Sequence, residues 1–214
     1  ARRLLVAGGI LMVLHVIGGT LIAYQWLTAE PGTQQALLPD WAFGANPDAL
    51  RYGQMIGTES FAERFARRIA GFGPALETQV PGIPSALGTM LVGAGLWRSG
   101  LLQGSWPRAR CLALARKLAL IALPPLVLLM LVDMWTGFTG AVVGPVSLFW
   151  SLPFDLLLAI AYAALVMALF AGRESALRRV LAATGRLSLT NYLLTSVVFA
   201  LLFNSWGLGL YGTV

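Results

Sequence analysis

Residues 4–27 read LLVAGGILMVLHVIGGTLIAYQWL, a run without a charged side chain. A membrane helix needs about 20 mainly apolar residues, because each residue rises about 1.5 Å and the hydrocarbon is about 30 Å thick. The run is longer than the apolar core of a signal peptide, which has about 7–15 residues. We therefore expect residues 1–27 to form a retained first transmembrane helix.

Four further segments meet the same test: residues 83–102, 112–135, 149–171 and 187–206. Of the 214 residues, 57% are hydrophobic and 11% are charged, whereas soluble domains carry about 25% charged residues. This composition excludes an ordinary soluble enzyme, a disordered tail and a nucleic-acid binder. No run alternates as β-barrel strands do. The sequence predicts an all-α polytopic transmembrane helix bundle with about five spans.

Connections that are rich in Lys and Arg alternate along the chain with connections that are not. Arg2 and Arg3 precede the first span, and basic clusters occupy residues 98–117 and 173–186. The connection 28–80 holds four Arg against six acidic residues, and 136–148 holds no charge. Because cytoplasmic loops are enriched in Lys and Arg, we expect a cytoplasmic N-terminus and an extracytoplasmic C-terminus. The four later spans form a transmembrane region over 81–214.

The extracytoplasmic loop 28–80 contains an interfacial amphipathic helix near residues 60–72. Ser60 and Glu63 fit a capping box at its start. Four apolar residues share one helical face, whereas Glu63, Arg64 and Arg67 fall elsewhere; the apolar residues are Phe61, Phe65, Ile69 and Phe72. The pattern predicts a helix on the outer membrane surface. Packing of this helix on the bundle stays open as an alternative.

Ionisable residues in the apolar segments are the first candidates for a site. His15, the lone histidine, falls mid-span with Gly8 and Gly19 on its face. It is a candidate catalytic base or a neutral imidazole hydrogen-bonded to another helix. Asp133 and Asp155 lie near the expected outer ends of the third and fourth spans. They form a paired-carboxylate site if those ends adjoin, but we favour a structural role for both.

The middle spans carry small residues and prolines that bear on packing. Ser85, Thr89 and Gly93 recur every four residues, which predicts a face for close helix approach. Pro124 and Pro125 lie in mid-membrane and predict a kink. A single cysteine excludes a disulfide within the chain and a multi-cysteine metal site. No metal site is therefore expected.

A polar stripe marks the last span, where Thr184, Ser188, Asn191 and Thr195 follow one helical face beside Tyr192. Polar groups are costly in hydrocarbon unless they find partners. The stripe therefore faces protein or a wet cavity. Helix–helix contact and a binding site are both open as its role.

Two runs of the chain match a known signature. Residues 185–196, GRLSLTNYLLTS, and 203–212, FNSWGLGLYG, resemble the C-terminal part of the YeiB-like bacterial membrane proteins, known as domain of unknown function 418. Upstream, 87–93 (LGTMLVG) and 98–102 (RSGLL) are similar to a further stretch of that family. The resemblance covers about residues 48–214. Full members resemble a longer chain with a further helical half, and they are distantly similar to polytopic membrane acyltransferases.

This resemblance implies part of a larger acyltransferase-like protein of the bacterial inner membrane. Acyl-CoA is the donor that it implies, and no other cofactor is evident. The expected partners are the lipid bilayer and either an N-terminal half or other membrane subunits, with no nucleic acid. The alternatives are an accessory or structural subunit and a transporter component. The signature and candidate substrate-lining residues are Gly185, Arg186, Ser188, Thr190, Asn191, Tyr192 and Thr195.

Overall fold

The computed structural model describes residues 1–33, 43–44, 49–170 and 176–210. All the regular elements within these ranges are helices, which confirms the all-α prediction. The contacts divide the chain into two compact units. Unit 1 comprises residues 1–46 and 81–173, and unit 2 comprises residues 47–80 and 174–214. The domain boundaries expected from the sequence, at residues 27/28 and 80/81, stay a prediction.

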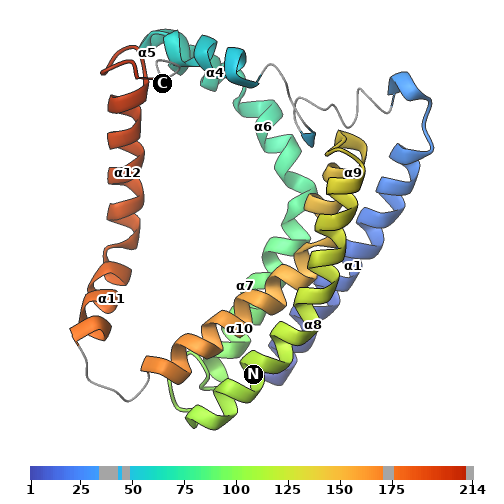
Figure 1. Cartoon of the computed structure of the whole chain (residues 1–214), viewed down its shortest axis with the longest axis vertical. Helices are drawn as coiled ribbons and strands as arrows, with labels where there is room; N and C mark the ends of the chain where they lie inside the picture. The colour runs from blue at the N-terminus through green and yellow to red at the C-terminus, as the bar shows by residue number, and fades with distance from the viewer. Residues whose placement is uncertain (34–42, 45–48, 171–175, 211–214) are drawn as a thin grey trace. The chain divides into compact units, whose positions relative to one another are not determined.

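Unit 1 is built from long helices in antiparallel pairs (Figure 1). One pair is α1 (Arg2–Leu27) with α7 (Ile83–Arg98), which follows the 3-10 turn η1 (Val80–Gly82). The other pair is α8 (Arg108–Trp135) with α10 (Leu152–Phe170). In the sequence, α9 (Gly140–Pro145) and the π-helix η2 (Val146–Trp150) lie between α8 and α10, and both contact α1.

Four helical segments are long and apolar enough to cross a membrane: Arg2–Leu27, Val80–Arg98, Arg108–Trp135 and Leu152–Phe170. They coincide with the first four predicted spans, although the second ends four residues earlier than expected. A fifth span exists if α11 (Ala176–Arg186) and α12 (Ser188–Phe203) count as one, but they are bent by 70° at Leu187. The prediction of about five spans is confirmed with this bend in the last.

A stripe of small residues lets α1 and α7 approach closely. The buried face of α1 consists of Gly8, Met12, His15, Gly19 and Ala23. A Cβ added at Gly8 would lie 2.6 Å from the Gly88 carbonyl oxygen of α7. The face of α7 that is buried contains Gly88, Val92 and Gly95. The sequence predicted that Ser85, Thr89 and Gly93 form the face for close approach. This prediction was wrong for Gly93, because a Cβ added there would meet nothing within 4 Å.

Residues 136–148, expected as a plain connection, are largely helical. Helix α9 and η2 occupy residues 140–150, and only Ser151 separates them from α10. Three small or rigid residues of this stretch are buried: Gly140, Gly144 and Pro145. Helix α8 likewise continues through Pro124 and Pro125 as one element.

The end of unit 1 that holds the α7–α8 loop has its own apolar cluster. Leu101 and Cys111 pack with Ala115 of α8 and with Ala164 and Ala168 of α10. The loop between α7 and α8 closes this end. Its turn depends on Gly100, whose φ of +86° lies in the left-handed region that favours glycine.

Unit 2 contains α4 (Ala49–Thr58), α5 (Phe61–Ala70), α6 (Phe72–Gln79), α11 and α12. The capping box predicted for α5 is confirmed: the Ser60 amide donates to Glu63 Oε2 at 2.8 Å, and the Glu63 amide donates to Ser60 Oγ at 3.3 Å. The Ser60 hydroxyl also donates to Glu63 Oε2 at 2.7 Å; this hydrogen bond and the one from the Ser60 amide lower the pKa of Glu63 below its ordinary value. They fix the start of α5.

Candidate functional site

His15 occupies the middle of α1 and contacts the α9–η2 segment. Its Nε2 lies 3.1 Å from the carbonyl oxygen of Leu148. A carbonyl oxygen only accepts hydrogen bonds, so Nε2 carries the hydrogen. The ring also packs against Phe149, with centroids 5.6 Å apart. Of the two alternatives open from the sequence, the geometry fits an imidazole hydrogen-bonded to another helix.

The π-helix explains why the Leu148 carbonyl needs this donor. In the i→i+5 pattern of η2 the Ser151 amide donates to the Val146 carbonyl at 2.9 Å. The same pattern pairs the Leu148 carbonyl with the nitrogen of Pro153, which has no hydrogen. His15 supplies the donor that Pro153 lacks.

A groove with a volume of about 490 Å³ lies between α1, α7 and α10 of unit 1. Its walls are mostly apolar. Asp155 is the one ionisable residue among the lining residues, which are Met12, Ser85, Ala86, Thr89, Leu152, Asp155, Leu156 and Ala159. Asp155 lies within α10, and its side chain is exposed.

Asp155 lies in the first turn of α10 and lines the groove together with Met12 of α1. Seven residues earlier, Leu148 contacts His15; nine residues later, Ala164 packs in the cluster at the end that holds the α7–α8 loop. As expected from the sequence, Asp155 lies three residues after the start of the candidate span Leu152–Phe170.

Asp133 occupies a different position from Asp155. It lies two residues before the end of α8, whereas Asp155 lies fifteen residues after the start of α9. Asp155 lines the groove with residues of α1 and α7, and Asp133 is not among the lining residues. The paired-carboxylate site and the structural roles that we favoured both stay predictions.

The polar atoms in the groove are hydrogen-bond acceptors. The Ser85 hydroxyl donates to the Gly82 carbonyl and the Thr89 hydroxyl to the Ala86 carbonyl, both at 2.8 Å. Their hydrogens are thus used within the chain, while the oxygen lone pairs stay available. An ionised Asp155 also only accepts. Within the described residues the groove therefore suits a ligand that donates a hydrogen bond, such as a hydroxyl or an ammonium group.

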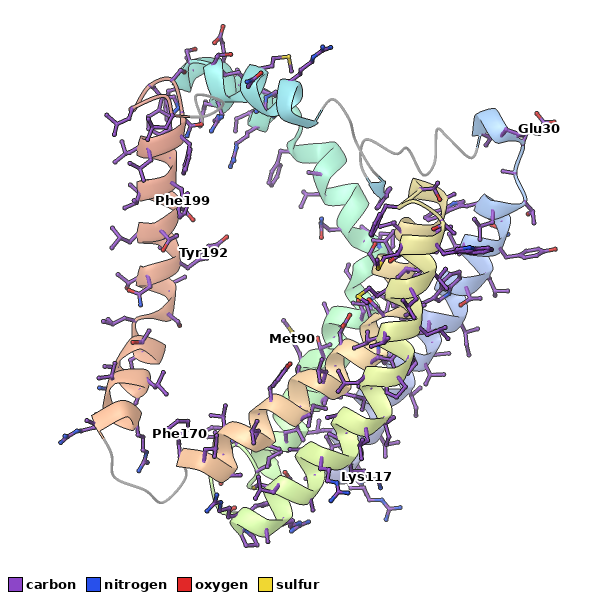
Figure 2. All side chains as sticks on the ribbon, viewed as in Figure 1. Glu30, Met90, Lys117, Phe170, Tyr192 and Phe199 are labelled. Atoms are coloured by element: carbon purple, nitrogen blue, oxygen red, sulfur yellow. The ribbon has the colours of Figure 1, made fainter. Side chains whose placement is uncertain are left out.

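Basic residues gather at the end of unit 1 that holds the α7–α8 loop. Arg98 ends α7, and Arg108 and Arg110 begin α8. The Arg110 guanidinium lies over the Trp106 ring, 3.7 Å from its centroid, and the Trp106 indole donates to the Ser99 carbonyl at 2.7 Å. Figure 2 shows Lys117 on α8 near this end. This end can bind an anion, because guanidinium and ammonium groups pair with phosphates.

The signature residues of the last span lie around the bend of unit 2. Gly185 and Arg186 end α11, and Ser188 begins α12. The bend removes Thr184 from the predicted stripe; its hydroxyl donates to the Val180 carbonyl within α11 at 3.0 Å. The side chains that remain on α12 are exposed: Ser188, Thr190, Asn191, Tyr192 and Thr195. Tyr192 projects from the middle of the helix (Figure 2). Their role in lining a substrate path stays a prediction.

The second signature run forms a corner that the sequence reasoning did not find. Asn204 ends α12 with its side chain only 6% exposed, and its amide group donates to the Ala200 carbonyl at 2.8 Å. The Leu208 amide folds back onto the Leu201 carbonyl at 2.7 Å. A Cβ at Gly207 would collide with that same carbonyl, and Gly209 has a φ of +64°. The two glycines spaced by one residue were the available signal for a turn.

The comparisons with known proteins agree with this organisation. A family model described as protein of unknown function (DUF418) matches residues 96–214, which is more than half of the chain. The chain belongs to this family and is an integral membrane protein. The match begins within α7, and the resemblance expected for residues 48–95 stays a prediction. No curated protein and no solved structure matches the chain.

Proposed function

We propose that this chain is part of a larger acyltransferase-like protein of the bacterial inner membrane, with its N-terminus cytoplasmic and its C-terminus outside. The observation that carries the proposal is the groove of α1, α7 and α10, in which the carboxylate of Asp155 lies between mostly apolar walls. An ionisable residue in the membrane interior is by default a functional one, because an isolated charge there is costly.

The groove suits the acceptor of an acyl group. The acceptor hydroxyl donates to Asp155, which takes its proton as general base. The hydroxyl oxygen then bonds to the thioester carbonyl carbon of the donor, and the carbon–sulfur bond breaks. The thiolate leaves and takes up the proton from Asp155. Acyl and acceptor chains lie against the apolar walls.

The basic end of unit 1 suits the phosphates of an acyl-CoA donor. Its cations are Arg98, Arg108, Arg110, Arg116 and Lys117. Thr89 in the groove and Arg98 are nine residues apart on α7, about 14 Å along the helix. A donor bound by its phosphates therefore reaches the groove through an extended arm. Arg186, Asn191 and Tyr192 belong to unit 2 and stay separate candidates for lining a substrate path.

The test uses the protein purified from its native membrane, whose intact mass shows how much more chain accompanies these 214 residues. A photoactivatable acyl-CoA is expected to label peptides of α1, α7 and α10. Asp155→Asn is expected to keep this labelling and to lose transfer by at least about a hundredfold, the usual contribution of a general base. Asp133→Asn is the matched control and retains transfer. Labelling confined to other peptides, or full activity in Asp155→Asn, contradicts the proposal.

Coupled transport is the second candidate, because a groove of acceptors around a carboxylate also binds a proton or an ammonium group. Its test is solute flux in liposomes that contain the purified protein. The transport hypothesis predicts a solute flux that Asp155→Asn abolishes and that Asn191→Leu reduces. Acyl transfer without flux rejects it.

A further inference from the structure

Unit 2 contains a cavity of about 410 Å³ between α5 and α12. One wall consists of Phe61, Arg64, Phe65 and Arg68, which follow one another at helical spacing on a single face of α5. The expectation that Arg64 lies away from the phenylalanines is therefore wrong. An arginine beside an apolar face lies along it with its methylene groups while its guanidinium reaches a polar partner.

The other wall is a continuous apolar face of α12. Its residues occur at spacings of three and four, and they are Leu193, Ser196, Val197, Ala200 and Leu201. At about 100° per residue, this face lies opposite the one that carries Ser188, Asn191 and Thr195. The Ser196 hydroxyl donates to the Tyr192 carbonyl at 2.9 Å, so its hydrogen is used within the helix. An alkyl chain laid along this wall loses no hydrogen bond.

The two walls are held together by contacts between distant parts of the sequence. The Ser205 amide donates to the Gly57 carbonyl at 2.8 Å, and the Ser205 hydroxyl donates to the Glu59 carbonyl at 2.7 Å. The Trp206 ring meets Phe61 edge to face, with centroids 5.7 Å apart. The signature corner thus closes one end of the cavity and keeps its shape.

The charge at the cavity is positive. Glu59 accepts two hydrogen bonds from Arg67, each at 2.8 Å, so its carboxylate is engaged by a residue that does not line the cavity. Arg64 Nε lies 3.8 Å from the same carboxylate, a longer contact. Arg64 and Arg68 lie four residues apart on the same wall, where two like charges repel each other. An anion between them removes this repulsion and accepts charge-assisted hydrogen bonds.

We propose that this cavity binds a phosphate-bearing lipid of the surrounding bilayer, with its phosphate between Arg64 and Arg68 and one acyl chain along α12. Charge complementarity and the alkyl-sized apolar wall favour a lipid over a free anion, which would leave the wall uncovered. The site is separate from the groove of unit 1, and it does not depend on acyl transfer.

The test measures lipid retained by the delipidated full chain in detergent, by native mass spectrometry. The probes are phosphatidylglycerol, diacylglycerol with the same chains and glycerol phosphate. Phosphatidylglycerol is expected to be retained well above diacylglycerol. The double variant Arg64→Gln, Arg68→Gln is expected to lower its retention by about tenfold or more, since hydrogen bonds to charged groups are the strong ones. Arg179→Gln, an exposed arginine of α11, is the matched control without effect.

Two further variants keep the result interpretable. Arg64→Lys with Arg68→Lys retains the charge and is expected to keep the preference for phosphatidylglycerol. Val197→Trp fills the cavity and is expected to lower retention of both lipids. Equal retention in all variants overturns the proposal and means that protein covers the cavity. Displacement of the lipid by glycerol phosphate at equal concentration overturns it in favour of a site for free phosphate.

Discussion

The imidazole of His15 and the carbonyl of Leu148 form a hydrogen bond of 3.1 Å between segments 133 residues apart in sequence. The bond joins α1 to the π-helix that precedes Pro153. A buried carbonyl without a donor costs free energy, and Pro153 removes the donor that the backbone would supply. The lone histidine therefore has a structural role, because it donates to a carbonyl of another segment that lacks a backbone donor.

This explanation predicts the behaviour of a double-mutant cycle. His15→Leu is expected to lower the free energy of unfolding by about 1–3 kcal/mol, the cost of an unsatisfied buried polar group. In a Pro153→Ala background the same substitution should cost less, because residue 153 then carries an amide hydrogen. Unfolding in mixed detergent micelles, followed by circular dichroism, measures all four proteins. Strict additivity of the two substitutions would show that Leu148 does not depend on this donor.

The glycines of α1 give a second prediction with an internal control. Gly8→Ala places a methyl group against the Gly88 carbonyl and Val92, so the helices must separate. Overpacking of this kind typically costs about 1–3 kcal/mol. Gly9→Ala meets nothing within 4 Å and should leave stability unchanged or slightly higher. Thermal unfolding of the two variants in one detergent compares them. Equal loss in both would mean that helix propensity, not packing, governs this face.

The helices of unit 1 could be predicted because apolar length alone defines them. The first span matches to within two residues at its start, since no competing signal interrupts residues 4–27. Residues 136–148 could not be predicted as helix, because glycine and proline in that stretch resemble turn signals. Burial of Gly144 and Pro145 against neighbouring helices overrides those local preferences.

The candidate sites were harder to predict from the sequence than the helices of unit 1. The capping box at Ser60 is a local pattern, and it was found for that reason. The cavity between α5 and α12 depends on Ser205 meeting Gly57 and Glu59, contacts across about 146 residues that no local pattern reveals. Asp155, the one charged residue between residues 136 and 171, was the signal that could have identified the groove.

The ion pair beside α5 predicts a dependence on pH. Hydrogen bonds from Arg67 lower the pKa of Glu59 below its ordinary value of 4.5. A lowered folded-state pKa means stabilisation that is present above pH 4.5 and is lost as the pH falls through the folded value. Amide exchange in α5, corrected for its intrinsic pH dependence, should therefore accelerate as the pH falls below 4.5. Arg67→Gln should reduce the part of this acceleration due to Glu59, and Ser60→Ala the part due to Glu63.

The signature corner predicts a contrast between two glycines of the family motif. Gly207→Ala places a methyl group against the Leu201 carbonyl, a backbone atom that cannot move aside, and a cost of about 1–3 kcal/mol or more is expected. Gly185→Ala meets nothing within 4 Å and should be neutral. Because the corner positions Ser205, Gly207→Ala should also speed amide exchange around Gly57. If amide exchange around Gly57 changed equally in Gly207→Ala and Gly185→Ala, the corner would not control the contact with Gly57.

Asp155 allows a prediction that separates function from structure. Its carboxylate lines the mostly apolar groove of unit 1 and has no hydrogen-bond partner among the described residues. Replacement of such a group by an apolar one removes a desolvation cost, so Asp155→Leu should raise the unfolding temperature in detergent by several degrees while activity is lost. A structural role gives the opposite sign, since removal of a helix-capping carboxylate lowers stability. Unfolding temperatures of the wild type, Asp155→Leu and Asp155→Asn decide between the two, because a cap retained by Asn and lost by Leu would rank Leu lowest.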